Sequence, residues 1–120
     1  SSGKRFSALK QAKIDMEEIE LNKYDVERNL MVAVKNYTDK MRTSIKSHNV
    51  ARAGIAQAQK GYDIAVKRYD TGAGTILEMD DSRLALTRAK LQANQAIFNF
   101  LSAKASLEET MGYDETSINE

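Results

Sequence analysis

In this chain of 120 residues, one pair of acidic side chains has a spacing that could serve to bind a cation. Glu78 and Asp81 stand three residues apart, so on a helix they share one face. A single pair of this kind usually serves as a helix cap and as solvent-exposed surface. If symmetry repeated the pair around an axis, the ring of carboxylates would bind cations and select for them. Glu78 and Asp81 are therefore candidates for an acidic, cation-binding ring.

No other group of residues supports catalysis. The chain has no cysteine, which excludes disulfides, thiolate nucleophiles and cysteine-ligated metals. His48 is the only histidine, and at helical spacing Ser44, Ala51 and Arg52 surround it without a carboxylate. A packed position on a helix seam explains His48 better than a catalytic one. We therefore expect no catalytic residue, no cofactor, no metal site of the usual kinds and no enzyme activity.

A short glycine-rich break divides the chain. Its residues are Thr71, Gly72, Ala73, Gly74 and Thr75. A phosphate-binding loop would need a third glycine, a following lysine and a preceding strand, and all three are missing. A tight turn between two helices is the simpler interpretation.

Both sides of the break have helical periodicity, and the absence of proline favours long uninterrupted helices. We predict a first arm over about 5–69 and a second over about 76–111. The first arm has apolar residues at steps of three and four, close to the coiled-coil period of 3.5, with a stutter between Tyr37 and Met41. Its stripe includes Leu9, Met16, Ile19, Val26, Met41, Ser44, His48, Ala51, Ile55, Ala58, Tyr62 and Ala65.

The second arm carries two apolar stripes, which predict two different helical neighbours. One stripe comprises Leu77, Leu84, Leu91, Phe98, Leu101 and Ala105. The other comprises Met79, Leu86, Ala89, Ala93, Ile97, Phe100, Ala103, Leu107 and Met111. The fold class is therefore all-α, a long antiparallel coiled-coil hairpin. Two helices bury a seam and not a full core, so we expect a fragment of a larger protein.

Local signals mark the ends of the second arm. Thr75 and Glu78 have the spacing of a capping box at its start. Gly112 follows the last periodic residue, as a C-terminal cap often does. Residues 112–120 are polar, and we expect a frayed tail.

Charge is balanced over the whole chain but uneven along it. Residues 1–70 hold 14 basic and 9 acidic side chains, and residues 71–120 hold 4 and 8. The densest basic run has one acid, Asp39, and comprises Lys35, Lys40, Arg42, Lys46, Arg52 and Lys60. A solvated helix face is the first explanation. The alternative function is a coiled-coil arm that binds another macromolecule, protein or RNA, through this basic face.

The segment from Arg68 to Gly112 resembles the C-terminal hairpin of TolC-family outer membrane efflux proteins. That family tends to have R-Y-x-x-G-x-x-T/S-x-x-D/E, then a Leu- and Ala-rich helix that ends in L-x-x-x-x-G. This chain has Arg68-Tyr-Asp-Thr-Gly-Ala-Gly-Thr-Ile-Leu-Glu78 and Leu107-Glu-Glu-Thr-Met-Gly112. The first arm resembles the family mainly in periodicity.

The resemblance implies a homotrimeric channel-tunnel with barrel strands, absent here, in the outer membrane of a Gram-negative bacterium. This hairpin would then lie in the periplasm as part of an α-helical barrel for efflux or type I secretion. The tip, Thr71–Thr75, would dock a periplasmic adaptor (membrane fusion) protein that leads to an inner-membrane pump. Glu78 and Asp81 would match the family's acidic positions that ring the closed entrance, where they can bind cations. The segment would help to gate that entrance, and no nucleic acid would be bound.

Three departures separate this chain from the family pattern. Thr71 replaces the usual valine, and Asp80 adds an acid where the family often has an apolar residue. Asp70 and Gly74 differ from the residues that latch the entrance in the family, so the latch does not carry over.

Overall fold

A computed structural model describes residues 1–112 and contains two helices. Helix α1 spans Ser2–Asp70 and helix α2 spans Ile76–Thr110. The predicted all-α coiled-coil hairpin is confirmed. Except for Gly112, the tail expected over 112–120 lies outside the described residues. Neither described helix combines the length and the apolar character needed to cross a membrane.

The chain divides into two compact units, Ser1–Asn36 and Tyr37–Glu120. In the first unit, every residue from 1 to 32 is exposed, including the apolar stripe residues Leu9, Met16 and Ile19. The boundary between the units falls at the position of the predicted stutter. The stutter itself stays a prediction.

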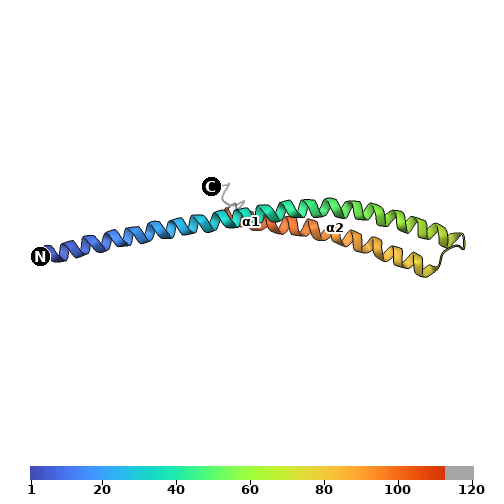
Figure 1. Cartoon of the computed structure of the whole chain (residues 1–120), viewed down its shortest axis with the longest axis horizontal. Coiled ribbons are helices and arrows are strands. Elements are labelled where there is room, and N and C mark those ends of the chain that lie inside the picture. The colour runs from blue at the N-terminus through green and yellow to red at the C-terminus, as the bar shows by residue number, and fades with distance from the viewer. Residues whose placement is uncertain (113–120) are drawn as a thin grey trace. The chain divides into compact units, whose positions relative to one another are not determined.

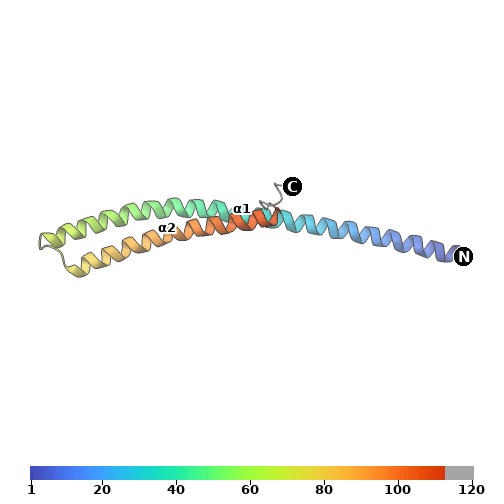
Figure 2. The same ribbon diagram turned by 180° about the vertical axis from the view of Figure 1, so that it is seen from behind.

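In the second unit, α2 runs antiparallel beside the part of α1 that begins at Tyr37 (Figures 1 and 2). The buried and half-buried positions recur at alternating steps of three and four, which is the coiled-coil period. On α1 they include Met41, Ser44, His48, Ala51, Ile55, Ala58, Tyr62 and Ala65, and on α2 they include Met79, Ser82, Leu86, Ala89, Ala93, Ala96, Phe100 and Ala103.

Small side chains fill the middle of this seam. Ala93, Ala96 and Ala103 are the most buried residues of α2, and Ala96 is only 4% exposed. On α1, Ser44 is also buried, and its hydroxyl donates to the carbonyl of Lys40 at 2.8 Å. Small residues let two backbones approach closely, and Leu86, 7% exposed, is the one large side chain buried between the helices among residues 1–112.

The other apolar stripe of α2 faces away from α1. Leu77 is 66% exposed and Leu91 is 60% exposed, and Leu84, Phe98 and Leu101 are exposed as well. The prediction for the covered stripe is wrong at Ile97 and Met111, which are 44% and 53% exposed. Ala96 is buried in place of Ile97 because the step that follows Ala93 is three residues and not four. Of the two seams predicted for this helix, the structure therefore covers one. The second remains an open apolar face.

Enlarging the seam should weaken the hairpin. We predict that Ala96→Leu destabilises the chain by about 1–3 kcal/mol, because added methylenes in a packed contact force side chains and backbone apart. Ala105→Leu is the control, since Ala105 lies on the exposed stripe. Urea unfolding followed by circular dichroism would measure both variants. Equal stability of the two would contradict the packing described here.

Candidate functional site

Helix α1 ends in a Schellman motif built around Gly72. The N–H of Ala73 donates to the carbonyl of Arg68 at 2.8 Å, and the N–H of Gly72 donates to the carbonyl of Tyr69 at 3.1 Å. These are the two hydrogen bonds that define the motif. Gly72 has a φ of 78°, in the left-handed region that favours glycine. A glycine is therefore the favoured residue at this position, where the helix stops and the chain reverses.

Helix α2 begins with the predicted capping box, which is confirmed. Thr75 is the N-cap, with an extended backbone at φ −95° and ψ 159°. Its hydroxyl accepts from the N–H of Glu78 at 3.1 Å, and the Glu78 carboxylate accepts from the N–H of Thr75 at 3.4 Å. This reciprocal pair satisfies backbone donors that a helix start leaves unpaired.

Arg68 links the end of α1 to the turn and to the start of α2. Its carbonyl accepts from Ala73 and also from the N–H of Gly74 at 2.9 Å and the hydroxyl of Thr71 at 3.2 Å. Its guanidinium donates to the carbonyl of Ala73 at 3.3 Å and lies 3.9 Å from the carboxylate of Glu78. One residue thus contacts three parts of the tip.

Gly74 approaches Arg68 too closely to carry a side chain. A Cβ atom on Gly74 would lie 2.9 Å from the Cβ of Arg68 and 3.3 Å from its carbonyl carbon. It would also lie 3.1 Å from an oxygen of Glu78. The positive φ angle favours glycine at position 72, whereas at position 74 there is no space for a Cβ atom. The two tip glycines therefore occur for different physical reasons.

The three acids after the turn differ in their partners. Glu78 is engaged in the capping box and lies near Arg68. Asp80 forms an ion pair with Arg83 at 3.3 Å within the same helix, and both side chains are about half exposed. Asp81 is exposed and has no ion pair with any residue from 1 to 112. Within that range, no cluster of three or more potential ligands could hold a metal ion.

Arg83 also connects the two helices. Its guanidinium carbon lies 5.8 Å from the centre of the Tyr62 ring on α1. Tyr62 and, to a smaller extent, the carboxylate of Asp80 raise the pKa of Arg83 above its usual value. The protonated guanidinium of Arg83 thus joins α2 to α1 a little more than two helical turns from the glycine-rich break.

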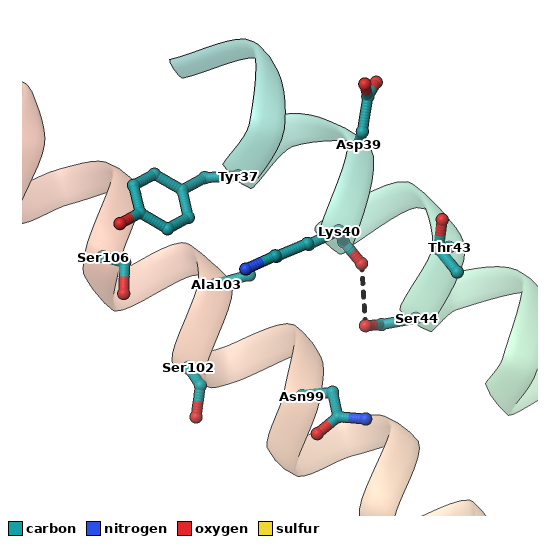
Figure 3. Close-up of a pocket in the computed structure, with 9 residues that line it drawn as sticks. All are labelled: Tyr37, Asp39, Lys40, Thr43, Ser44, Asn99, Ser102, Ala103 and Ser106. Carbon is teal, nitrogen blue, oxygen red and sulfur yellow. Dashed lines mark hydrogen bonds between the residues drawn. The ribbon is translucent and has the colours of Figure 1, made fainter. Parts of the chain in front are cut away.

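A groove of about 540 Å³, lined mainly by residues with polar side chains, lies between the helices at the end of α2 farthest from the tip (Figure 3). Tyr37 and Lys40 come from α1 and Ser102, Ala103 and Ser106 from α2, with the Tyr37 ring directed toward α2. The Lys40 ammonium lies 5.7 Å from the centre of that ring. Short side chains on α2 leave this space open. The groove contains none of the tip residues and neither Glu78 nor Asp81, and Lys40 is its one residue from the basic run.

His48 is a half-buried seam residue beside Ala96 and Phe100, in agreement with the sequence interpretation. The six residues of the basic run are all exposed on α1, as a solvated face requires. Among them, Arg42 lies 3.9 Å from the carboxylate of Asp39.

Comparison with known proteins agrees with this architecture. The sequence profile of the family described as "Outer membrane efflux protein" matches residues 1–113, nearly the whole chain. The chain belongs to the outer membrane efflux protein family. It is also 24% identical over 106 residues to "Outer membrane protein TolC" of Escherichia coli (strain K12). That match covers 88% of this chain but 22% of TolC, so the chain spans about a fifth of that relative. No solved structure matches the chain significantly.

The structure brings together most of the residues that the sequence singled out in this efflux-family hairpin. Thr71–Thr75 and Glu78 form one hydrogen-bonded unit, whereas Asp81 stands apart from it. Sequence reasoning missed the central role of Arg68 and the close approach at Gly74. Two signals were available: Arg68 is the first residue of the family motif, and it lies four residues before Gly72, about one helical turn from the break.

Removing the N-cap should loosen the start of α2. We predict that Thr75→Ala lowers the free energy of unfolding by about 1 kcal/mol, because the Glu78 amide loses its acceptor. Thr75→Ser keeps the hydroxyl and should remain near the wild-type value. Thermal unfolding of the two variants would measure the difference, and identical losses would show that the hydroxyl contributes nothing.

Proposed function

We propose that this chain is a periplasmic hairpin of an outer membrane efflux or secretion channel, and that its tip docks a periplasmic adaptor protein. The observation that carries the proposal is the family match combined with an ordered tip. Thr71, Gly72, Ala73 and Thr75 are exposed while their backbone is held by two helix caps. A preorganised, accessible turn suits docking because little conformational entropy is lost on binding.

The parent protein on this proposal is a homotrimer that lies in the outer membrane of a Gram-negative bacterium. The hairpin belongs to a helical barrel in the periplasm, and the adaptor connects its entrance to an inner-membrane pump. Passage, docking and gating are the functions, without catalysis. The exposed stripe of Leu77, Leu84 and Leu91 supports this arrangement, since a wall of helices needs a second apolar face.

We assign Glu78 and Asp81 to an acidic ring at the entrance. Asp81 is exposed and has no ion pair with residues 1–112, so its charge is available to a cation or a neighbouring subunit. Glu78 keeps one carboxylate oxygen in the capping box, and its side chain is about half exposed. Repetition of both residues around a three-fold axis would create the cation-binding ring.

Crosslinking at the tip tests the docking proposal. Because the chain has no native cysteine, Ala73→Cys introduces a single thiol at an exposed position of this segment. In intact cells that express the full-length protein, a short thiol-to-amine crosslinker should join it to an adaptor-sized envelope protein. Abundant, folded protein without that product would contradict the assignment and favour the alternative, a coiled-coil arm that binds through its basic face.

Two substitutions at Gly72 test whether docking and export depend on the backbone conformation of the tip. We predict that Gly72→Val blocks adaptor crosslinking and export, because a β-branched residue resists the positive φ of 78°. Gly72→Asn is the matched control, since asparagine tolerates this conformation, and it should retain most activity. Helical content should be unchanged in both variants. Normal efflux in Gly72→Val would show that the shape of the tip is unimportant.

A further inference from the structure

We propose that the contact between Gly74 and Arg68 is the positioning element of the tip, holding the turn in its docking conformation. This inference rests on the function proposed above. It concerns two residues that do not need to touch the adaptor themselves. Their role is to fix where the exposed residues Thr71, Gly72 and Ala73 lie.

The first step of the argument is the geometry of the turn. The Schellman motif ends at Ala73 and the capping box starts at Thr75. Gly74 is the single residue between the two caps, so its conformation determines how one cap is joined to the other. Its N–H donates to the carbonyl of Arg68 at 2.9 Å, which holds it against the last turn of α1.

The second step is the lack of space at Gly74. The φ of Gly74 is not positive, so another residue could adopt its backbone conformation. The obstacle is instead the Cβ of Arg68, 2.9 Å from where a Cβ on residue 74 would lie. A Cβ atom is fixed to the backbone and cannot rotate away, so an added methyl group must displace the turn from the helix.

The third step is the guanidinium of Arg68, which contacts residues on both sides of Gly74. It donates to the carbonyl of Ala73 and approaches Glu78, so it spans Gly74 from one cap to the other. Both groups are about half exposed, so this ion pair is weak by itself. We therefore assign the larger part of the positioning to the close approach of the two backbones.

The chain provides a matched control for a glycine-to-alanine change. Gly61 lies within α1, is exposed, and has no atom within 4 Å of the position a Cβ would take. Gly61→Ala should leave the tip undisturbed. Gly74→Ala adds the same methyl group where it collides with Arg68.

The test measures the tip and its docking separately in the full-length protein. Hydrogen–deuterium exchange of the peptide that contains residues 71–75 reports the turn, and crosslinking from Ala73→Cys reports the adaptor. We expect Gly74→Ala to speed exchange of the Ala73 amide roughly tenfold, equivalent to about 1.4 kcal/mol, and to reduce crosslinking several-fold. Gly61→Ala should change neither. Wild-type exchange in Gly74→Ala would overturn the inference.

Two changes at Arg68 make the test specific to the contact. Arg68→Ala keeps the Cβ atom, so Gly74→Ala should remain harmful in that background. Arg68→Gly removes the Cβ atom, so the further effect of Gly74→Ala should become clearly smaller. An equal effect in both backgrounds would show that this contact does not position the turn.

The outcomes also separate the inference from the function on which it rests. Absence of adaptor crosslinking in the unmodified tip would overturn the proposed function, whatever the exchange data show. Faster exchange in Gly74→Ala with full crosslinking would show that docking does not depend on the conformation of the turn, and it would overturn the positioning role.

Discussion

The unpaired backbone groups at two helix ends dictate the structure of the tip. A helix leaves several carbonyls without partners at its C-terminus and several N–H groups at its N-terminus. Here five residues must serve both ends while the chain reverses direction. They do so with a Schellman motif at Gly72 and a capping box at Thr75, which leave only Gly74 between them. The tip is therefore made of two helix caps joined by one residue.

Small side chains also determine how closely α1 and α2 pack in the seam next to the tip. Alanines at the centre of α2 allow close packing, and the period of 3.5 keeps them on the side that faces α1. Arg83 reaches Tyr62 across the seam and pairs with Asp80 on its own helix. Asp80, the extra acid relative to the family pattern, thus has an ion-pair partner three residues away.

Most of the fold could be predicted from the sequence, because it depends on local periodicity and on local capping signals. The two helices, the seam containing Leu86 and Ala93, and the Thr75–Glu78 capping box are of this kind. The steric role of Gly74 could not be predicted, since it depends on where the turn places residue 74 relative to Arg68 in space. The partners of Glu78, Asp80 and Asp81 also required coordinates, because spacing alone makes the three acids look alike.

The open stripe on α2 has a thermodynamic consequence. Leu77, Leu84, Leu91 and Phe98 repeat every seven residues on a face that α1 does not cover. Any molecule that binds this face in the folded state alone stabilises that state by mass action. The melting temperature of such a segment then rises with the concentration of the molecule that binds the stripe.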